Sequence, residues 1–352
     1  MRSRYSLATH SRDLEVNVIA GNRRPRFAWQ CAVSVLVAVI STALLGVGVS
    51  QAEPVRPTIQ RTVDEGQGVT AVYVYSPAMR KTIKVQVITP RNPSGTRPSL
   101  YLLSGLGEED PTNSMWLRKT DARNFYADKN VNVVMPLAGN GSFYTDWQRD
   151  DPKLGRYQWE TFLVKELPPL IDAAFDGNGR RGIAGISMGA GAGLVLAARN
   201  PGFYKAVGAY SGCYSTAGIA GETYPRAIVA AFGGDANNMW GPPGSSGWAA
   251  HDVLSLAHNL RGTTLYISTG TGRSGTYDQP GYPDNSDPVD RQVIGGAIET
   301  GSLWCTQQLE SRLTAQHIGA TIRYVDPGTH AWPYWRDQQR ESWPTLERGM
   351  NS

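Results

Sequence analysis

The sequence predicts an α/β fold with a mostly parallel central sheet, flanked by helices and led by antiparallel strands on its N-terminal side. Three observations favour this class. Short apolar runs alternate with helix-like segments, two early segments show the two-residue alternation of half-buried strands, and the length of 352 residues suits one large domain after a leader. No internal repeat is visible.

The beginning of the chain has the composition of an export signal. Arg23, Arg24 and Arg26 precede an uncharged run over 27–49, and small residues near Ala52 match those that a signal peptidase reads. We expect 1–52 to be a signal peptide; the run is also long enough for a membrane anchor, and this alternative stays open. Residues 53–68 are expected to form an extended arm, and 69–352 a single domain.

The charge balance excludes a polyanion partner. The net charge is +4, but residues 1–52 hold six arginines and two acidic residues, so the rest of the chain is neutral. A neutral domain lacks the electrostatic footprint of a nucleic-acid binder. No His, Cys or carboxylate cluster has metal-ligand spacing, so we expect neither a metal nor a cofactor.

The expected elements follow from hydrophobic periodicity. Ile83, Val85 and Val87 alternate with polar residues, whereas later runs are continuously apolar, as in strands covered on both faces. Residues 212–250 are rich in Gly, Pro and Trp and are expected to form an irregular excursion above the sheet. Strands are expected at 69–75, 81–88, 100–103, 131–135, 181–186, 206–210, 264–268 and 321–325, and helices at 121–128, 157–175 with a kink at Pro168-Pro169, 190–200 and 290–317.

Ser187 lies in Gly185-Ile186-Ser187-Met188-Gly189, between a strand-like run and a helix of small residues. The Gly-x-Ser-x-Gly pattern alone is weak evidence. Between a strand and a helix, however, it predicts a nucleophile elbow, a turn so sharp that it needs glycine on both sides and exposes the serine oxygen above the sheet. Ser187 is therefore the candidate nucleophile.

A serine nucleophile needs an imidazole to take its proton. Of the five histidines, His10 lies in the leader and three others, at 251, 258 and 317, fall on or near helices. Only His330 is placed in a loop just after the last expected strand. His330 is therefore the candidate base.

The imidazole in turn needs a carboxylate, and in the α/β-hydrolase fold the chain order is serine, acid, histidine. The acid is expected in the loop after the strand 264–268, where it can reach the base. Asp278 is the first carboxylate there, and Asp284, Asp287 and Asp290 are the alternatives.

An acyl-transfer site also needs amides that meet the developing oxyanion. One is expected from Met188, the residue after the nucleophile. The second is expected from the loop after the strand 100–103, at Leu106, with Gly107 as the alternative. A simple glycine turn is the competing interpretation of this loop.

Cysteine usage agrees with export. Cys31 lies in the leader, so the remaining chain holds Cys213 and Cys305. We favour a disulfide between them; two inert buried thiols are the alternative.

Longer aromatic-rich motifs are more specific than the serine pattern. They are NVVMP (132–136), SFYTDW (142–147), WETFL (159–163), GISM (185–188), MWGP (239–242) and GTHAW (328–332). In this order they resemble the exported mycolyltransferases of mycolic-acid bacteria, the antigen 85 group, and within it the corynebacterial type. The resemblance covers nearly all of the chain after the leader.

This resemblance implies an α/β-hydrolase that takes a mycolyl group from trehalose monomycolate onto its serine and passes it to a second trehalose mycolate or to cell-wall arabinan. It carries over Ser187 as nucleophile, His330 as base, and Leu106 and Met188 as oxyanion amides. The family's acid is a glutamate, for which Asp278 stands here as a substitution. A secreted or cell-envelope location, with membrane association left open, is implied as well.

The loop at 104–107 departs from the family. Members with bound trehalose use an aspartate and an arginine there, where this chain has Ser104 and Gly107. Each lost hydrogen bond to a charged group is worth about 1.5–3 kcal/mol, so sugar affinity or acceptor choice is expected to differ. Ser104, Trp332 and Trp147 are the expected sugar contacts.

Two other functions remain open. A secreted serine carboxylesterase would use the same residues but let water resolve the acyl-enzyme. A non-catalytic wall-binding member of the fold would have lost its nucleophile, and retention of Ser187 and His330 argues against it.

Overall fold

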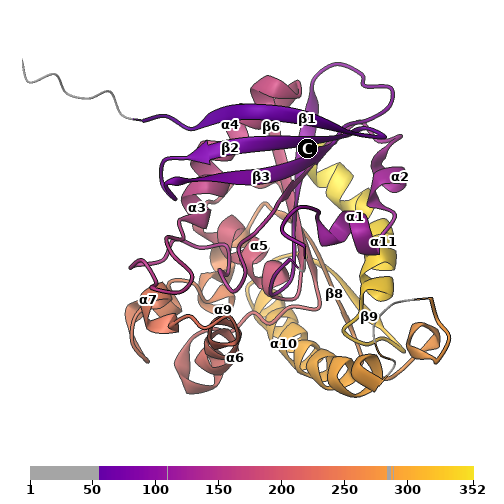
Figure 1. Cartoon of the computed structure of the whole chain (residues 1–352). Coiled ribbons are helices and arrows are strands. Elements are labelled where there is room, and N and C mark those ends of the chain that lie inside the picture. Colours follow the sequence, from indigo (N-terminus) through magenta and orange to yellow (C-terminus); the bar gives the residue numbers. More distant parts are fainter. Residues whose placement is uncertain (1–54, 109, 284–286, 288) are drawn as a thin grey trace, which may run out of the picture. The chain divides into compact units, whose positions relative to one another are not determined.

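The computed structural model describes residues 55–352, apart from 109, 284–286 and 288. The expected signal segment 1–52 lies outside the described residues. Across these residues runs one nine-stranded sheet with the order β1-β2-β3-β5-β4-β6-β7-β8-β9 (Figure 1). The strands are β1 (Thr58–Gly66), β2 (Val69–Ser76), β3 (Lys81–Ile88), β4 (Arg97–Leu103), β5 (Asn132–Pro136), β6 (Gly177–Ile186), β7 (Ala206–Tyr210), β8 (Thr264–Gly270) and β9 (Thr321–Val325).

The strand directions confirm the predicted sheet. β1 to β3 pair antiparallel with one another, β3 pairs antiparallel with β5, and all pairs from β5 to β9 are parallel. Because the strands from β4 to β9 are parallel, their carboxyl ends meet at one edge of the sheet, which is where ligands bind in open α/β sheets. The fold is that of an α/β-hydrolase.

Helices cover both faces of the sheet (Figure 1). The side chains of α4, α5 and α10 belong to one buried core, and those of α1, α2 and α11 to the other. The helices are α1 (Met115–Lys119), α2 (Ala122–Tyr126), α3 (Trp159–Thr161), α4 (Leu167–Ala174), α5 (Met188–Arg199), α6 (Gly218–Ala231), α7 (Ala236–Trp240), α8 (Ser246–Ala249), α9 (Val253–Leu256), α10 (Gly296–Ala315) and α11 (Trp332–Asn351), with the short segments η1 (Phe162–Glu166), η2 (Ala257–Leu260), η3 (Thr276–Asp278) and η4 (Asp290–Gly295).

Successive residues of the inner strands enter opposite cores. Ile183 packs with α5 on one face, and the next residue, Ala184, packs with α11 on the other. Ile267 and Tyr266 of β8 divide in the same way. This two-sided burial explains why these strands read as continuous apolar runs.

The expected arm 53–68 contributes an edge strand. Thr58–Gly66 is extended as expected, but it pairs antiparallel with β2, with irregular register near Ile59 and Asp64. Most of its side chains are exposed. Charged and polar residues with bulges are typical of edge strands, which explains why the segment shows no apolar periodicity.

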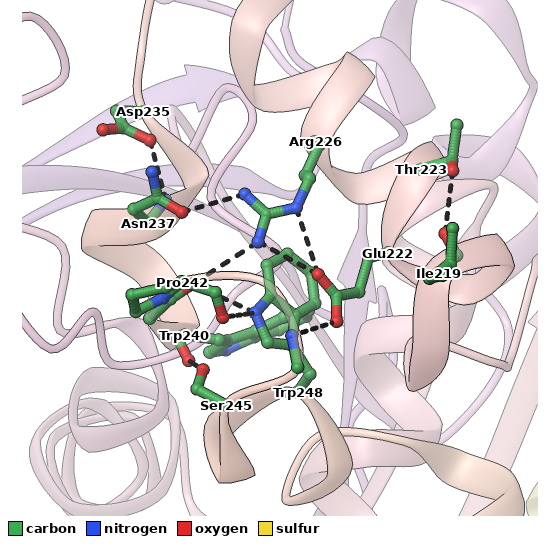
Figure 2. Close-up of polar contacts among 12 residues, drawn as sticks. Ile219, Glu222, Thr223, Arg226, Asp235, Asn237, Trp240, Pro242, Ser245 and Trp248 are labelled. Carbon is green, nitrogen blue, oxygen red and sulfur yellow. Dashed lines mark hydrogen bonds and ion pairs between the residues drawn. The ribbon is translucent and has the colours of Figure 1, made fainter. Parts of the chain in front are cut away.

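The excursion at 212–250 is more regular than expected, because it contains the fourteen-residue helix α6. Its glycines and Pro225 hide the helical pattern. Figure 2 shows how α6 is fastened: Arg226 pairs with Glu222 at 3.0 Å and bonds Asn237 at 3.0 Å. The Arg226 guanidinium also lies 4.4 Å from the centre of the Trp248 ring. These contacts join α6 to α7 and α8, and Arg226 also donates to the carbonyl of Gly241 in the MWGP motif at 3.5 Å.

Two further segments differ from the expectation. The expected helix 157–175 is divided into α3, the π-helical η1 and α4, and the two prolines lie in the first turn of α4, just after η1 ends. Proline lacks an N–H, so a regular ladder cannot continue through this pair. The C-terminal helix α11 was not expected; its buried residues include two tryptophans and Leu346. Among the described helices, none is both long and apolar enough to span a membrane.

Candidate active site at the carboxyl edge of the sheet

Ser187 is the single residue between β6 and α5. Its backbone has φ 52° and ψ −119°, a conformation that residues with a side chain rarely adopt. The Ser187 amide donates to the carbonyl of Tyr210 at 2.9 Å, which fastens the turn to the end of β7. Such backbone strain persists only where the surroundings enforce it, and it clusters at active sites.

The glycines on both sides of Ser187 are required by close approach. A Cβ on Gly185 would collide with the carbonyl of Gly189, and a Cβ on Gly189 would collide with the carbonyl of Ser104. The loop after β4 therefore lies directly against the first turn of α5. A Cβ at Gly105 would lie 3.6 Å from Cβ of Ser187, so this loop also lies beside the serine.

The two expected oxyanion amides lie on these neighbouring segments. Met188 is the first residue of α5, so its N–H has no acceptor within the helix. Leu106 lies in the loop beside Ser187, and its carbonyl accepts a hydrogen bond from Gly141 at 2.8 Å. The structure thus places both residues near the serine, while their binding of an oxyanion stays a prediction.

His330 lies between β9 and α11, as predicted. Its backbone amide donates to the carbonyl of Gly295 at 3.1 Å, and its ring packs edge-on against Trp335. Nδ1 of His330 lies 2.7 Å from Oε2 of Glu299. Among the described residues, no hydrogen bond joins Oγ of Ser187 to Nε2 of His330, and neither atom has another hydrogen-bond partner.

Glu299 is a completely buried carboxylate in the first turn of α10. Besides His330, it accepts hydrogen bonds from the Ser211 hydroxyl at 2.6 Å, the Thr269 hydroxyl at 3.1 Å and the Gly270 amide. Burial raises its pKa, but the bond and charge of His330 and these further donors outweigh burial and hold the pKa of Glu299 below its usual value. An ionised carboxylate at Nδ1 keeps the proton there and leaves Nε2 as an acceptor.

Asp278 does not have the expected position, and this corrects the sequence-based prediction of the acid. It is fully buried and accepts hydrogen bonds from the Gly275 amide at 2.7 Å, the Thr329 hydroxyl at 2.6 Å and the Tyr334 hydroxyl at 2.7 Å. These contacts brace the residue before His330 and the start of α11. Asp278 therefore supports the loop of His330, whereas Glu299 bonds the imidazole.

Glu299 was missed because the acid was sought in the loop and not on the helix that follows it. A signal was present: Glu299 begins the buried stripe of α10, whose later members are Ser302, Thr306, Leu309 and Leu313. An acid on a buried helical stripe needs a partner. Of the alternatives, Asp287 caps the turn at Val289, Asp290 lies at the pocket of His330, and Asp284 lies outside the described residues.

A pocket of about 250 Å³ opens beside His330. Ile294 and Ile298 form one wall, and Trp332 and Trp335 form another. Trp332 is partly buried and lines this pocket, and its role as a substrate contact stays a prediction. The apolar walls suit a ligand with a hydrocarbon part.

The other two expected sugar contacts are engaged inside the protein. Trp147 is 3% exposed, packs edge-on against Tyr157 and donates to the carbonyl of Ser142 at 3.1 Å. Ser104 is 1% exposed, and its hydroxyl donates to Glu108. Trp147 and Ser104 are therefore almost entirely buried, whereas Trp332 lines the pocket of His330. Buried tryptophans more often serve the core, and Trp147 follows that rule.

Cys213 and Cys305 form the predicted disulfide. It connects the loop after β7 to α10, six residues beyond Glu299. His251 is structural: burial lowers its pKa to about 4, and its ring stacks on Trp240. Within the residues that the structure describes, no group of three or more His, Cys, Asp or Glu could hold a metal ion.

Residues 76–343 match a family model described as "Putative esterase". The chain belongs to this esterase family. Its curated relatives include the diacylglycerol acyltransferase/mycolyltransferase Ag85A of Mycobacterium tuberculosis, which is 30% identical over 296 residues, covering 82% of this chain and 83% of the relative. The Ag85B protein of Mycobacterium leprae is 31% identical over 295 residues, covering 81% and 85%. The resemblance to the antigen 85 group is thereby confirmed.

Solved structures agree with the fold of this esterase-family protein. MPT51 of Mycobacterium tuberculosis superimposes with a TM-score of 0.64 at 25% identity, covering 78% of this chain and 96% of that one. An S-formylglutathione hydrolase of Agrobacterium tumefaciens gives a TM-score of 0.58 at 19% identity, covering 83% and 99%, and supports the fold alone. Family membership indicates an esterase-like or acyltransferase function.

Proposed function

We propose that this protein is an exported serine acyltransferase that moves mycolyl groups from trehalose monomycolate to a second trehalose monomycolate or to cell-wall arabinan. The observation that carries the proposal is the buried Glu299 bonded to His330, at the sheet edge where Ser187 occupies its strained turn. The names of the curated relatives support acyl transfer as the reaction class.

In the first half-reaction, Oγ of Ser187 attacks the ester carbonyl while Nε2 of His330 takes its proton. Glu299 keeps Nδ1 protonated and stabilises the imidazolium. The amides of Met188 and Leu106 bind the oxyanion. The ester C–O bond then breaks, His330 returns the proton to the trehalose oxygen, and the mycolyl group stays on Ser187.

In the second half-reaction, an acceptor hydroxyl gives its proton to His330 and attacks the acyl-enzyme. Collapse of the oxyanion breaks the bond to Oγ of Ser187, which regains the proton from His330. The acceptor leaves as the new ester. Trp332 is the proposed contact for the sugar, because its indole lies at the pocket of His330.

Export is the second part of the proposal. Residues 1–52 have the composition of a signal peptide. The disulfide between Cys213 and Cys305 supports an oxidising compartment outside the cytosol. The cell envelope, where the acceptors lie, is the proposed location.

The deciding experiment is an assay of the purified protein with trehalose monomycolate, scoring dimycolate against free mycolic acid. We expect dimycolate from wild type and neither product from Ser187→Ala. Ser245→Ala serves as a control for the loss of a serine hydroxyl, because Ser245 donates to the carbonyl of Trp240 and contacts neither Glu299 nor His330, and it should retain Ser187-dependent labelling by a fluorophosphonate. Dimycolate from Ser187→Ala would refute the proposed nucleophile.

A secreted carboxylesterase is the second candidate. It is favoured because the two positions that carry charged sugar contacts in the family carry none here. Ser104 is buried and donates its hydroxyl to Glu108, and Gly107 has no side chain. Free acid as the sole product would support this candidate. Diacylglycerol belongs among the tested acceptors, since the relatives' names include it.

A further inference from the structure

Glu108 is a buried carboxylate that directly follows the loop 104–107. It is 7% exposed. Its Oε1 accepts a hydrogen bond from the Ser104 hydroxyl, and its Oε2 accepts one from the Met115 amide at 2.8 Å. Its own amide donates to Oδ1 of Asn140 at 3.1 Å. The side chain thus joins the first residue of the loop to the start of α1.

The position of Ser104 sets the position of the loop beside the nucleophile. The carbonyl of Ser104 lies against Gly189, and Gly105 lies beside Ser187. At the other end, a Cβ on Gly107 would lie 2.8 Å from Oδ1 of Asn140. There is little room for the loop to shift without displacing one of these contacts, so a change at Glu108 is transmitted to the amide of Leu106.

The electrostatic setting of Glu108 is unfavourable to its charge. Burial raises the pKa of Glu108 from 4.5 to about 6, against the lowering effects of the Ser104 and Met115 hydrogen bonds and of Arg118. Asp110 raises it further. Among the described residues, the Tyr144 hydroxyl also belongs to this setting, because it accepts a hydrogen bond from the Ser104 amide at 3.2 Å.

This shift means that ionised Glu108 destabilises the folded protein. A carboxyl with a raised folded-state pKa contributes stability at low pH that is lost as pH rises from about 4.5 to about 6. At neutral pH Glu108 is therefore ionised, and its ionisation lowers the free energy of unfolding. Groups kept at such a cost are typical of functional sites.

We infer that Glu108 is a positioning residue for acyl transfer, which fixes the oxyanion amide of the loop 104–107 by holding the Ser104 hydroxyl. This inference rests on the proposed function. It adds a regulatory property, because protonation of Glu108 removes the charge that strengthens its hydrogen bonds from Ser104 and Met115, and so weakens its hold on the loop. The reaction is then slower in mildly acidic surroundings.

The chain offers a matched control in Glu166. It is also 7% exposed and accepts hydrogen bonds from a serine hydroxyl, Ser76, at 2.5 Å and from a backbone amide, Ala78, at 2.9 Å. Ser76 ends β2, which three strands separate from β6. Glu166→Gln therefore removes the same kind of charge from the same kind of contact, away from the proposed site.

The experiment measures hydrolysis of a short p-nitrophenyl ester and fluorophosphonate labelling of Ser187 from pH 5 to 8, with melting temperatures. For Glu108→Gln we expect kcat to fall about tenfold above pH 6.5 with KM little changed, as for a loss of transition-state positioning. The ratio of the wild-type kcat to the variant kcat removes the pH effects of groups that both proteins share. This ratio should approach one below about pH 5.5, where Glu108 of the wild type is protonated. The melting temperature of Glu108→Gln at neutral pH should equal or exceed that of wild type.

Two further variants separate positioning from simple damage. Ser104→Ala should lower kcat like Glu108→Gln, and the double variant should lose no more than either, because both remove one contact. Glu166→Gln should keep the wild-type kcat. An unchanged kcat in Glu108→Gln, or a loss of kcat that does not vary with pH, would overturn the inference. Labelling of wild type, together with dimycolate formation in the assay above, would still uphold the proposed function. A wild type without labelling or turnover would overturn both.

Discussion

Nδ1 of His330 lies 2.7 Å from Oε2 of Glu299, a carboxylate with no exposed surface. The base and its carboxylate come from different parts of the fold, a loop after β9 and the first turn of α10. Glu299 also accepts hydrogen bonds from the hydroxyls of Ser211 and Thr269. Ser211 directly follows β7, and Thr269 lies next to the last residue of β8. The pair is therefore built on the ends of adjacent parallel strands.

Glu299→Gln should lower kcat about 10³- to 10⁴-fold, because an amide at Nδ1 no longer fixes the tautomer or stabilises the imidazolium. The measurement is kcat for p-nitrophenyl ester hydrolysis, with circular dichroism to confirm folding. Asp278→Asn is the matched control: it removes an equally buried charge that contacts Thr329 and Tyr334 instead. We expect it to lower thermal stability more than it lowers kcat. The reverse ranking would restore Asp278 as the acid.

The stability of the protein should fall in acid through Glu299. Its folded-state pKa is held below the usual value of 4.5, so its contribution is present above pH 4.5 and is lost as pH falls through the folded pKa. Denaturant melts of wild type and Glu299→Gln from pH 3 to 7 test this. The stability difference between them should shrink as the pH drops below 4.5. A difference independent of pH would contradict the assignment.

Gly189→Ala should abolish turnover. The added Cβ would collide with the carbonyl of Ser104, so α5 and the loop 104–107 must separate. Overpacking of this kind costs roughly 1–3 kcal/mol in stability. Gly193→Ala, in the same helix, is the control, since its Cβ would lie 3.7 Å from Ile183, an ordinary contact. It should remain active and keep or gain stability, by up to about 1 kcal/mol from helix propensity. Equal activity of the two variants would argue against the close approach.

Removal of the disulfide should destabilise the protein. Cys213 and Cys305 are 92 residues apart, and closing a loop of that size stabilises by about 4.6 kcal/mol in the chain-entropy model. The double variant Cys213→Ala, Cys305→Ala should melt at a markedly lower temperature. Intact mass before and after reduction should show a gain of two hydrogen atoms in wild type and none in the variant. An unchanged mass in wild type would reject the bridge.

The sheet and the nucleophile turn were predictable from sequence because their causes are local. Two-sided burial makes β6 and β7 continuous apolar runs, and the turn at Ser187 requires glycines at 185 and 189. His330 could be selected because only one histidine follows the last strand in a loop. The disulfide followed from the presence of two cysteines in the chain after residue 52.

The remaining features depend on tertiary contacts that a sequence does not display. Asp278 and Glu299 are both buried acids after β8, and only the packing of α10 against β8 decides which reaches the imidazole. Trp147 reads like a sugar platform but is enclosed by Tyr157 and Ser142. Helix α6 is hidden by Pro225, and its attachment depends on Arg226.

The division of the interior into two cores has a consequence for Ser187. The residue before it, Ile186, is buried in the core beneath α11, and the residue after it, Met188, is buried in the core beneath α5. Its unfavourable dihedral angles are thus anchored at both ends by apolar packing on opposite sides of the molecule. Because both flanking side chains are fixed, the backbone of Ser187 cannot return to a favourable conformation unless one of them leaves its core. The serine therefore keeps its orientation before any substrate arrives.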